Sequence, residues 1–344
     1  MMSENINLEY SILIIKSIGK KSFQTLADCI QKSRSTISRL LPSSEKNFAM
    51  MQKIAQSFFK DKKELALAID DTLIKKTHSR FMHGAGYFYD TKIGRSIMAY
   101  RLLCSAITDG NYIFPLECLY LFSSEFKIDF AKSKSDIVKQ IILLALKLFP
   151  NKIIIVVADG AFATTEILTW CILNKISAEM RMHKNRKVFY KGKFVVISKI
   201  LTLIPRGRIK ARTIQVLWHD LPLYITAQKR TVKHGSETIV YQVSTYKAMP
   251  TKHVANYKKR WPIEKIFRTT KQHLGLQECF STKMHVQLNH VSAVLLSYSF
   301  LNLEQKANHF STPEDALRFL KSKKLSNLKS RNNRSGQIFG GIYA

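Results

Sequence analysis

The chain has 344 residues, of which 46% are hydrophobic, so it is long enough to form two or three domains with a buried core. Its 55 lysines and arginines outnumber the 24 acidic residues and give a net charge of +31, which favours a polyanionic partner. No apolar run is long enough to span a bilayer, so we expect nucleic acid as that partner and no membrane contact. The five cysteines are scattered, which favours a reducing compartment, and we expect the cytoplasm.

The first 60 residues carry helical patterns, and residues 22–41 resemble a helix-turn-helix. Apolar residues at helical spacing would pack both helices of this unit, and a serine would cap the second. The second helix would then present Arg34 and Arg39 to a DNA groove, which makes them candidate DNA-binding residues. Any small helical hairpin shows similar spacing, and the usual glycine of the turn is absent, so a purely structural hairpin is the alternative.

A short apolar run, residues 65–69, ends in two carboxylates, Asp70 and Asp71. This pattern predicts a buried strand that delivers acids at its end. Isolated pairs of this kind also serve as turn or cap residues. Because neighbouring side chains of a strand point to opposite faces, either carboxylate could be directed inward, and we favour Asp70.

Two strand-like runs, residues 96–108 and 112–122, flank Asp109-Gly110, which is a strong signal for a β-hairpin. Residues 136–149 follow with apolar positions at helical spacing, and a serine just before them can cap the helix. The pattern therefore predicts a hairpin and then a helix.

The run from Lys152 to Ala158 is almost entirely apolar and ends in Asp159. A continuous apolar strand usually lies inside a sheet that is covered on both faces. An aspartate at the carboxyl end of such a strand, just before a helix, is where α/β folds place functional groups. The alternative role for Asp159 is to cap the helix expected over residues 164–174.

Between residues 180 and 250 the pattern becomes strand-like, over residues 193–197, 213–218, 223–228 and 238–244. The stretch from Arg181 to Lys271 contains 22 lysines and arginines against three acidic residues, so its loops could contact phosphates. Trp218 is a candidate for stacking on an unpaired DNA base, with a core or interface position as the alternative.

The stretch from Tyr257 to Lys271 reads Tyr, two residues, Arg260, three residues, Glu264, six residues, Lys271. Pro262 predicts the start of a helix, because proline is costly inside one, and Tyr257 and Arg260 would lie on the turn before it. Glu264 and Lys271 are seven positions apart, so they lie on one line of that helix, at the edge of its buried stripe.

This spacing resembles the signature of DDE-type bacterial insertion-sequence transposases, in particular the insertion sequence four group. The contexts Asp-Asp-Thr and Asp-Gly-Ala-Phe around the two upstream carboxylates are also similar to that family's first two motifs. The resemblance implies an α/β fold: a ribonuclease-H-like mixed-sheet core, interrupted by a β-rich insertion and preceded by the helical region. It further implies a DNA transposase, with Tyr257, Arg260 and Lys271 holding the DNA backbone near the cleaved end.

In the resemblance, Asp70, Asp159 and Glu264 fill the three catalytic positions, with Asp71 as the alternative to Asp70. Carboxylates are hard oxygen ligands, and three of them can hold two Mg²⁺ ions, with Mn²⁺ as a substitute. Cut-and-paste transposition is the function implied, on double-stranded DNA with terminal inverted repeats and a target, by a homodimer in a bacterial cell. A catalytically silent DNA-binding protein and a metal-dependent endonuclease without strand transfer are the alternatives.

These observations divide the chain into five expected parts. They are a helical DNA-binding region (1–60), the first part of the core (61–179), the β-strand insertion (180–250), the C-terminal helices of the core (251–310) and a basic, flexible tail (311–344).

Overall fold

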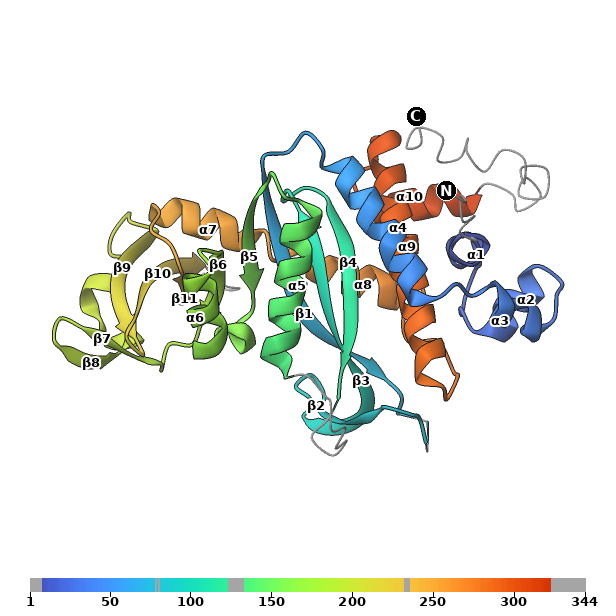
Figure 1. Cartoon of the computed structure of the whole chain (residues 1–344), viewed down its shortest axis with the longest axis horizontal. Coiled ribbons are helices and arrows are strands. Elements are labelled where there is room, and N and C mark those ends of the chain that lie inside the picture. Colours follow the sequence, from blue (N-terminus) through green and yellow to red (C-terminus); the bar gives the residue numbers. More distant parts are fainter. Residues whose placement is uncertain (1–7, 78, 80, 123–132, 232–235, 323–344) are drawn as a thin grey trace.

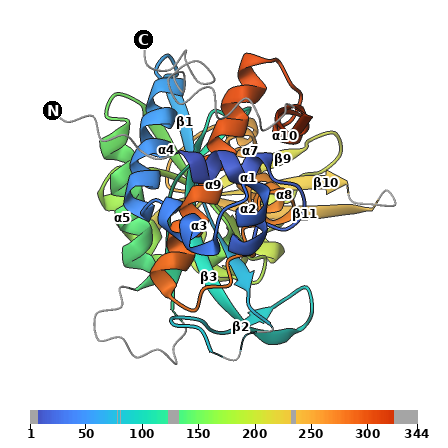
Figure 2. The same ribbon diagram turned by 90° about the vertical axis from the view of Figure 1, so that its right-hand side faces the viewer.

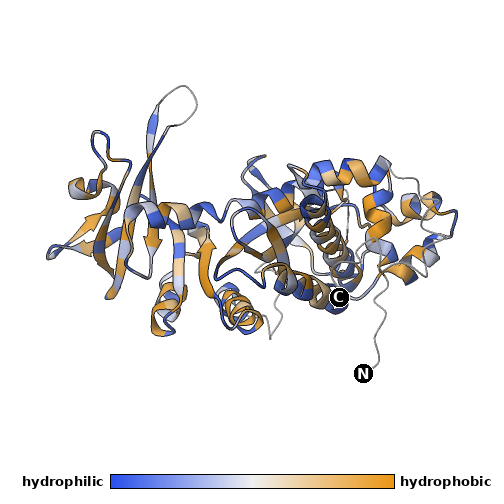
Figure 3. Cartoon of the chain, turned by 90° about the horizontal axis from the view of Figure 1, so that it is seen from above, coloured by the Kyte–Doolittle hydropathy of each residue, from blue (hydrophilic) through white to orange (hydrophobic). Residues whose placement is uncertain are grey.

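One mixed β-sheet runs along most of the molecule, with a helical region beyond one of its ends (Figure 1). This computed structural model describes residues 8–77, 79, 81–122, 133–231 and 236–322. Figure 3 shows from above that the molecule is elongated, because the sheet and the helical region follow one another along its length.

The strands are β1 (Glu64–Lys75), β2 (Gly86–Asp90), β3 (Arg95–Thr108), β4 (Ile113–Leu121), β5 (Ile153–Ala158), β6 (Ser177–Met182), β7 (Lys187–Tyr190), β8 (Lys193–Val196), β9 (Ala211–Trp218), β10 (Leu221–Thr231) and β11 (Glu237–Ser244). The α-helices are α1 (Glu9–Lys16), α2 (Phe23–Cys29), α3 (Arg34–Leu40), α4 (Ser44–Phe58), α5 (Lys134–Leu148), α6 (Thr165–Leu173), α7 (Pro250–Lys258), α8 (Pro262–His273), α9 (Met284–Ala307) and α10 (Pro313–Ser322). Short 3₁₀ segments are η1 (Gly160–Phe162), η2 (Ile197–Lys199) and η3 (Leu201–Leu203).

The half of the sheet nearer the helical region has the strand order β4-β3-β1-β5-β6. β3 and β4 form the predicted hairpin around Asp109-Gly110, where Gly110 has a φ of +104° that residues with a side chain rarely adopt. β1 is antiparallel to β3 and parallel to β5, and β5 is parallel to β6. β1 does not end at Asp70, as expected from the sequence, but continues to Lys75, whereas β5 ends just before Asp159; the two strands are direct neighbours.

Helices cover both faces of this half of the sheet (Figure 1). α5 packs on one face against β1 and β4, whereas α8 packs on β1 and α7 on β5 and β6 from the opposite face. β5 is buried from Ile154 to Ala158, which accounts for its continuous apolar sequence. This half of the sheet is thus a middle layer between helices. The turn between α7 and α8 carries Arg260, which contacts Asp70 of β1.

The β-rich segment extends the same sheet instead of forming a separate one. β11 pairs antiparallel with β6, and β10, β9, β7 and β8 follow outward in that order. The expected boundary between residues 179 and 180 therefore falls inside β6. The four strands expected in this segment correspond to β8–β11, whereas β6 and β7 escaped sequence-based prediction.

The N-terminal region is helical, and Figure 2 shows its helices clustered around α9. Ser22 and Ser33 cap α2 and α3 by accepting hydrogen bonds from the Thr25 and Thr36 backbone N–H groups. α1 and α4 pack on α9, whose apolar residues are buried on all sides. α9 lies within the part of the chain expected to form the C-terminal helices of the core, residues 251–310.

The expected tail, residues 311–344, begins with a packed helix. α10 buries Ala316, Leu317 and Leu320 against α9. The first part of the expected tail is therefore an amphipathic helix that is ordered by burial. Residues 323–344 lie outside the described residues. Within the described ranges, none of the helices combines the length and the apolar character needed to cross a bilayer.

Candidate active site

Asp70, within β1, and Asp159, directly after β5, lie side by side in the interior of the sheet. Ile69 of β1 pairs with Ala158 of β5 in parallel register, so the next residue of each strand carries its carboxylate to the same place. Burial raises the pKa of Asp70 to about 6; the Arg260 guanidinium opposes that rise, while the Asp71 and Asp159 carboxylates add to it. Within the described residues, the Asp159 carboxylate forms no hydrogen bond or ion pair. This site therefore concentrates negative charge, which the Arg260 guanidinium and the Lys134 amine partly offset.

Asp71 points away from this pair. Its carboxylate forms an ion pair with Arg101 on β3 and lies 3.8 Å from the Lys134 amine at the start of α5. Strand alternation thus directs Asp70 to the α8 face and Asp71 to the α5 face. The geometry favours Asp70 over Asp71 as the partner of Asp159.

Arg260 joins Asp70 to Glu264. α8 begins at Pro262, as predicted, and Glu264 lies in its first turn. The Arg260 Nη1 lies 3.0 Å from the Asp70 Oδ2, and its Nη2 donates to the Glu264 Oε1. The guanidinium is only 12% exposed, so it is held between the two carboxylates. Arg260 therefore links two of the three predicted acids, Asp70 and Glu264, whereas Asp159 lies beside Asp70 through the pairing of β1 with β5.

Lys271 lies two turns further along α8 and also contacts β1. Its amine donates to the Thr72 hydroxyl at 2.6 Å, on the same face of the strand as Asp70. Burial lowers the pKa of Lys271 to about 8, and the nearby Lys92 and Lys75 amines act in the same direction. Arg260 and Lys271 thus place two positive charges over the same face of β1.

Tyr257 and Trp218 differ from their sequence-based expectations. Tyr257 belongs to α7 and not to the turn, because Pro250 starts a helix that continues to Lys258; its ring is 6% exposed. The Arg260 guanidinium lies 5.8 Å from that ring. Trp218 is 4% exposed within the core of the insertion, so its ring is not available to stack on a DNA base and the core alternative applies.

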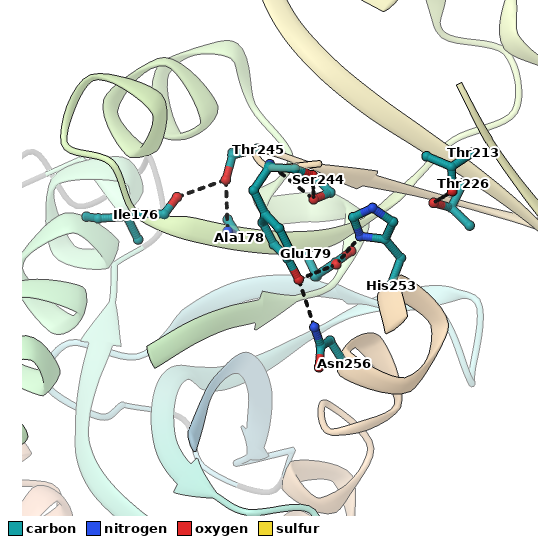
Figure 4. Close-up of polar contacts among 10 residues, drawn as sticks. Ile176, Ala178, Glu179, Thr213, Thr226, Ser244, Thr245, His253 and Asn256 are labelled. Carbon is teal, nitrogen blue, oxygen red and sulfur yellow. Dashed lines mark hydrogen bonds and ion pairs between the residues drawn. The ribbon is translucent and has the colours of Figure 1, made fainter. Parts of the chain in front are cut away.

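A buried polar network anchors α7 behind this site, and sequence reasoning missed it (Figure 4). Glu179 on β6 accepts a hydrogen bond from the Tyr246 hydroxyl at 2.7 Å and pairs with the Nδ1 of His253 on α7. Asn256, also on α7, donates to the Tyr246 oxygen at 2.8 Å. Burial raises the pKa of Glu179, while His253 and Tyr246 oppose that rise. The network fixes the helix that leads into Arg260.

No local sequence pattern predicts this network. Glu179 looks like a surface residue of a basic stretch, and its partner His253 lies 74 positions away. Only the packing of α7 on β6 brings the two together. The same applies to Arg101 and Lys134, whose roles depend on which face Asp71 takes.

The fold is similar to that of a transposase of known structure. It matches piggyBac transposase, seen by cryo-EM in a synaptic complex with hairpin DNA, with a TM-score of 0.52 and 11% sequence identity over 99% of this chain and 76% of that one. At this identity the likeness concerns the fold alone. No curated protein matches the sequence.

The family follows from the sequence match. The family model described as "Transposase DDE domain" matches residues 61–300, which is well over half of the chain. The chain therefore belongs to the family of transposases that carry a DDE domain.

Transposases of this family generally use divalent metal ions. Within the part of the chain that the structure describes, no three His, Cys, Asp or Glu side chains lie close enough together to hold one. Arg260 lies between Asp70 and Glu264 and pairs with both. The donor set nevertheless fits such an ion, because carboxylates are hard oxygen ligands and Asp159 has no competing partner.

Proposed function

We propose that this transposase belongs to the insertion sequence four group, binds the terminal inverted repeats of its element, cleaves DNA there and joins the freed ends to target DNA. The observation that carries the proposal is the side-by-side placement of Asp70 and Asp159, with Glu264 linked to Asp70 through Arg260. The strand order β4-β3-β1-β5-β6 supports a ribonuclease-H-like core as its framework.

Asp70, Asp159 and Glu264 would hold Mg²⁺ ions, with Mn²⁺ as a substitute. When bound, a pair of such ions supplies a deprotonated water or 3′-hydroxyl nucleophile and stabilises charge on the leaving oxygen. Burial of Asp70 serves this role, because a carboxylate removed from water gains more from a cation than an exposed one. Asp71, paired with Arg101, would instead keep the end of β1 in place.

Arg260 and Lys271 would bind the DNA backbone beside the acids. A guanidinium can bind a phosphate through two parallel hydrogen bonds, whereas an ammonium acts as a point charge. In the described structure both terminal nitrogens of Arg260 contact carboxylates, so a phosphate must displace at least one of them. Arg260 would thus pass from the acids to the DNA as the substrate enters.

The helical region would bind the inverted repeats. α2 and α3 form the capped helical pair expected of a helix-turn-helix, and Arg34 and Arg39 are exposed on α3. We further propose that two copies bring the two element ends together. A net charge of +31 suits an assembly that holds several DNA segments at once.

The test is nicking of a plasmid that carries the element's own ends, in the presence of Mn²⁺. Wild type should nick the plasmid, whereas Asp159→Asn and Glu264→Gln should lose cleavage about a thousandfold while still binding DNA, since a metal ligand contributes several kcal/mol. Glu166→Gln is the matched control, because Glu166 is a surface carboxylate on α6 paired with Lys139.

Three outcomes would argue otherwise. Nicking that survives in both variants would place the chemistry elsewhere or in a contaminant. Binding without any nicking, while another transposase cuts its own ends under the same conditions, would identify a silent DNA-binding protein. Nicking whose 3′ ends never join a second duplex would identify an endonuclease.

A further inference from the structure

A basic groove lies between the helical region and the start of α9, apart from the candidate active site. Its volume is about 640 Å³, and its walls come from α2, α3 and residues 281–286. Figure 2 shows α2 and α3 in front of the lower part of α9. The lining residues are Phe23, Arg34, Ser35, Ser38, Arg39, Ser281, Lys283, His285 and Val286.

The lining carries positive charge and hydroxyl groups but no carboxylate. Arg34, Arg39 and Lys283 are exposed, and in the described structure none of them forms an ion pair with an acidic side chain. The serine hydroxyls and His285 add neutral hydrogen-bonding groups. Guanidinium, ammonium and hydroxyl groups together are the set that proteins use on nucleic-acid phosphates.

The groove combines two segments that are about 250 positions apart in the sequence. Residues in and just before this segment contact the chain that follows β1: the His83 N–H donates to the Thr282 carbonyl at 3.1 Å, and the Lys76 amine donates to the Cys279 carbonyl. Arg34 and Arg39 are therefore positioned against residues connected directly to the strand that bears Asp70.

The strand β1 leads from the acids toward the chain that precedes the groove wall. Six residues of extended chain separate Asp70 from Lys76, which is about 20 Å along the strand. Since base pairs rise about 3.4 Å each, about six of them span that length. Lys76 donates to the Cys279 carbonyl, two residues before the groove wall formed by residues 281–286, so a duplex that follows β1 from Asp70 approaches that wall.

We propose that this groove binds the phosphate backbone of duplex DNA, on the same duplex whose end enters the candidate active site. Lys283 and His285, which the sequence did not single out, are then DNA-binding residues alongside Arg34 and Arg39. The proposal rests on the proposed function, because it requires that the protein acts on DNA ends. It adds that α9 takes part in binding and that the helical region does not act alone.

The test measures binding of a fluorescein-labelled 30-base-pair duplex over a range of salt concentrations. Because each phosphate contact adds about 0.9 to the salt slope, Arg34→Gln/Lys283→Gln should bind about tenfold more weakly and lower the slope by about 2. The matched control is Lys53→Gln/Lys147→Gln, which removes the same charge from exposed lysines of α4 and α5. It should differ little from wild type.

A footprint on the wild-type protein avoids any question of folding. Lysine acetylation followed by mass spectrometry should show that the duplex protects Lys283 but leaves Lys147 reactive. Equal salt slopes for the two double variants, or a Lys283 that stays reactive with duplex bound, would overturn the groove proposal. Protection of Lys283 by anionic phospholipid vesicles but not by duplex would overturn it in favour of a membrane surface.

The plasmid nicking assay is independent of these outcomes. If nicking depends on Asp159 and Glu264 but the groove variant binds like its control, the groove proposal fails and the proposed function stands. If the groove variant loses affinity and salt slope while wild type never nicks, the duplex contact at the groove stands, whereas its link to the candidate active site and the proposed function both fail.

Discussion

Asp70 and Asp71 are adjacent on β1 and point to opposite faces of the sheet, so they provide a matched pair of variants. Asp70→Asn should reduce metal-dependent nicking about a thousandfold, because it removes one oxygen ligand from a buried carboxylate site. Asp71→Asn should retain nicking within about tenfold. Its main effect should be a lower free energy of unfolding, because Arg101 and Lys134 lose their acidic partner. Nicking rates at equal protein concentration check this. If Asp71→Asn lost more nicking activity than Asp70→Asn, Asp71 would be the metal ligand instead.

Arg260 competes with cations for the carboxylates that it joins. Replacing it by glutamine should therefore strengthen Mn²⁺ binding to the DNA-free protein several-fold, because a positive charge leaves the site. The same variant should cleave DNA more slowly, since the phosphate loses its partner. Titration of Mn²⁺ by electron paramagnetic resonance measures the first effect. Arg268→Gln is the control, on the exposed face of the same helix; equal Mn²⁺ affinities for both variants would contradict the competition.

The orientation of Asp70 and Asp71 and the partners of Arg260 depend on packing that the sequence alone does not predict. Strand alternation established that Asp70 and Asp71 face opposite ways but left the inward one open, because that depends on which helices cover each face. The contacts of Arg260 with Asp70 and Glu264 could not be predicted either, although Arg260 itself was a candidate site residue. The spacing of Tyr257, Arg260, Glu264 and Lys271 identifies the residues, and only the packing of α8 on β1 gives their partners.

At the scale of elements, α7 depends on the buried pair of Glu179 and His253. His253→Ala would leave the Glu179 carboxylate buried without this hydrogen-bond partner, so the free energy of unfolding should fall by about 2 kcal/mol. Lys252→Ala, on the exposed face of the same helix, should change it little. Unfolding in urea, followed by circular dichroism, compares the two. Equal stabilities would mean that Tyr246 and Asn256 hold α7 without the histidine.

Elements with local signals were predicted well. The Asp109-Gly110 hairpin, the apolar strand β5 and the start of α8 at Pro262 all depend on residues within a few positions of one another. β6 was missed because it is short and carries Glu179 and Arg181, which read as surface residues. Its burial depends on α7 and β11, far along the chain. The α10 helix, placed in a flexible tail, was missed for the same reason.

At the scale of the whole molecule, His290 on α9 ties together three distant parts of the chain. Its Nε2 lies 2.9 Å from the Gly275 carbonyl, which can only accept, so its Nδ1 accepts from the Tyr10 hydroxyl. Burial lowers the pKa of His290 to about 4, and nearby Lys76 acts in the same direction. The neutral ring is therefore the form that the folded state requires.

The pH dependence follows from this shift. Between pH 6.5 and about 4 the unfolded chain binds a proton at this position and the folded chain does not. The contribution of His290 is complete above pH 6.5 and is lost as the pH falls to about 4, which amounts to about 3 kcal/mol. Urea unfolding at several pH values should show a shallower acid loss in His290→Asn than in wild type. Parallel curves would mean that His290 titrates normally.

The pairing of β6 with β11 means that the two halves of the sheet share one row of backbone hydrogen bonds. If the strands beyond β6 were removed, the N–H and C=O groups along one side of β6 would lose their partners, and an unpaired strand is a template for self-association. A shortened relative of this chain would therefore need another element to cover that border. The insertion is in this sense a protective edge as well as a source of positive charge, and its loss would threaten solubility before it affected catalysis.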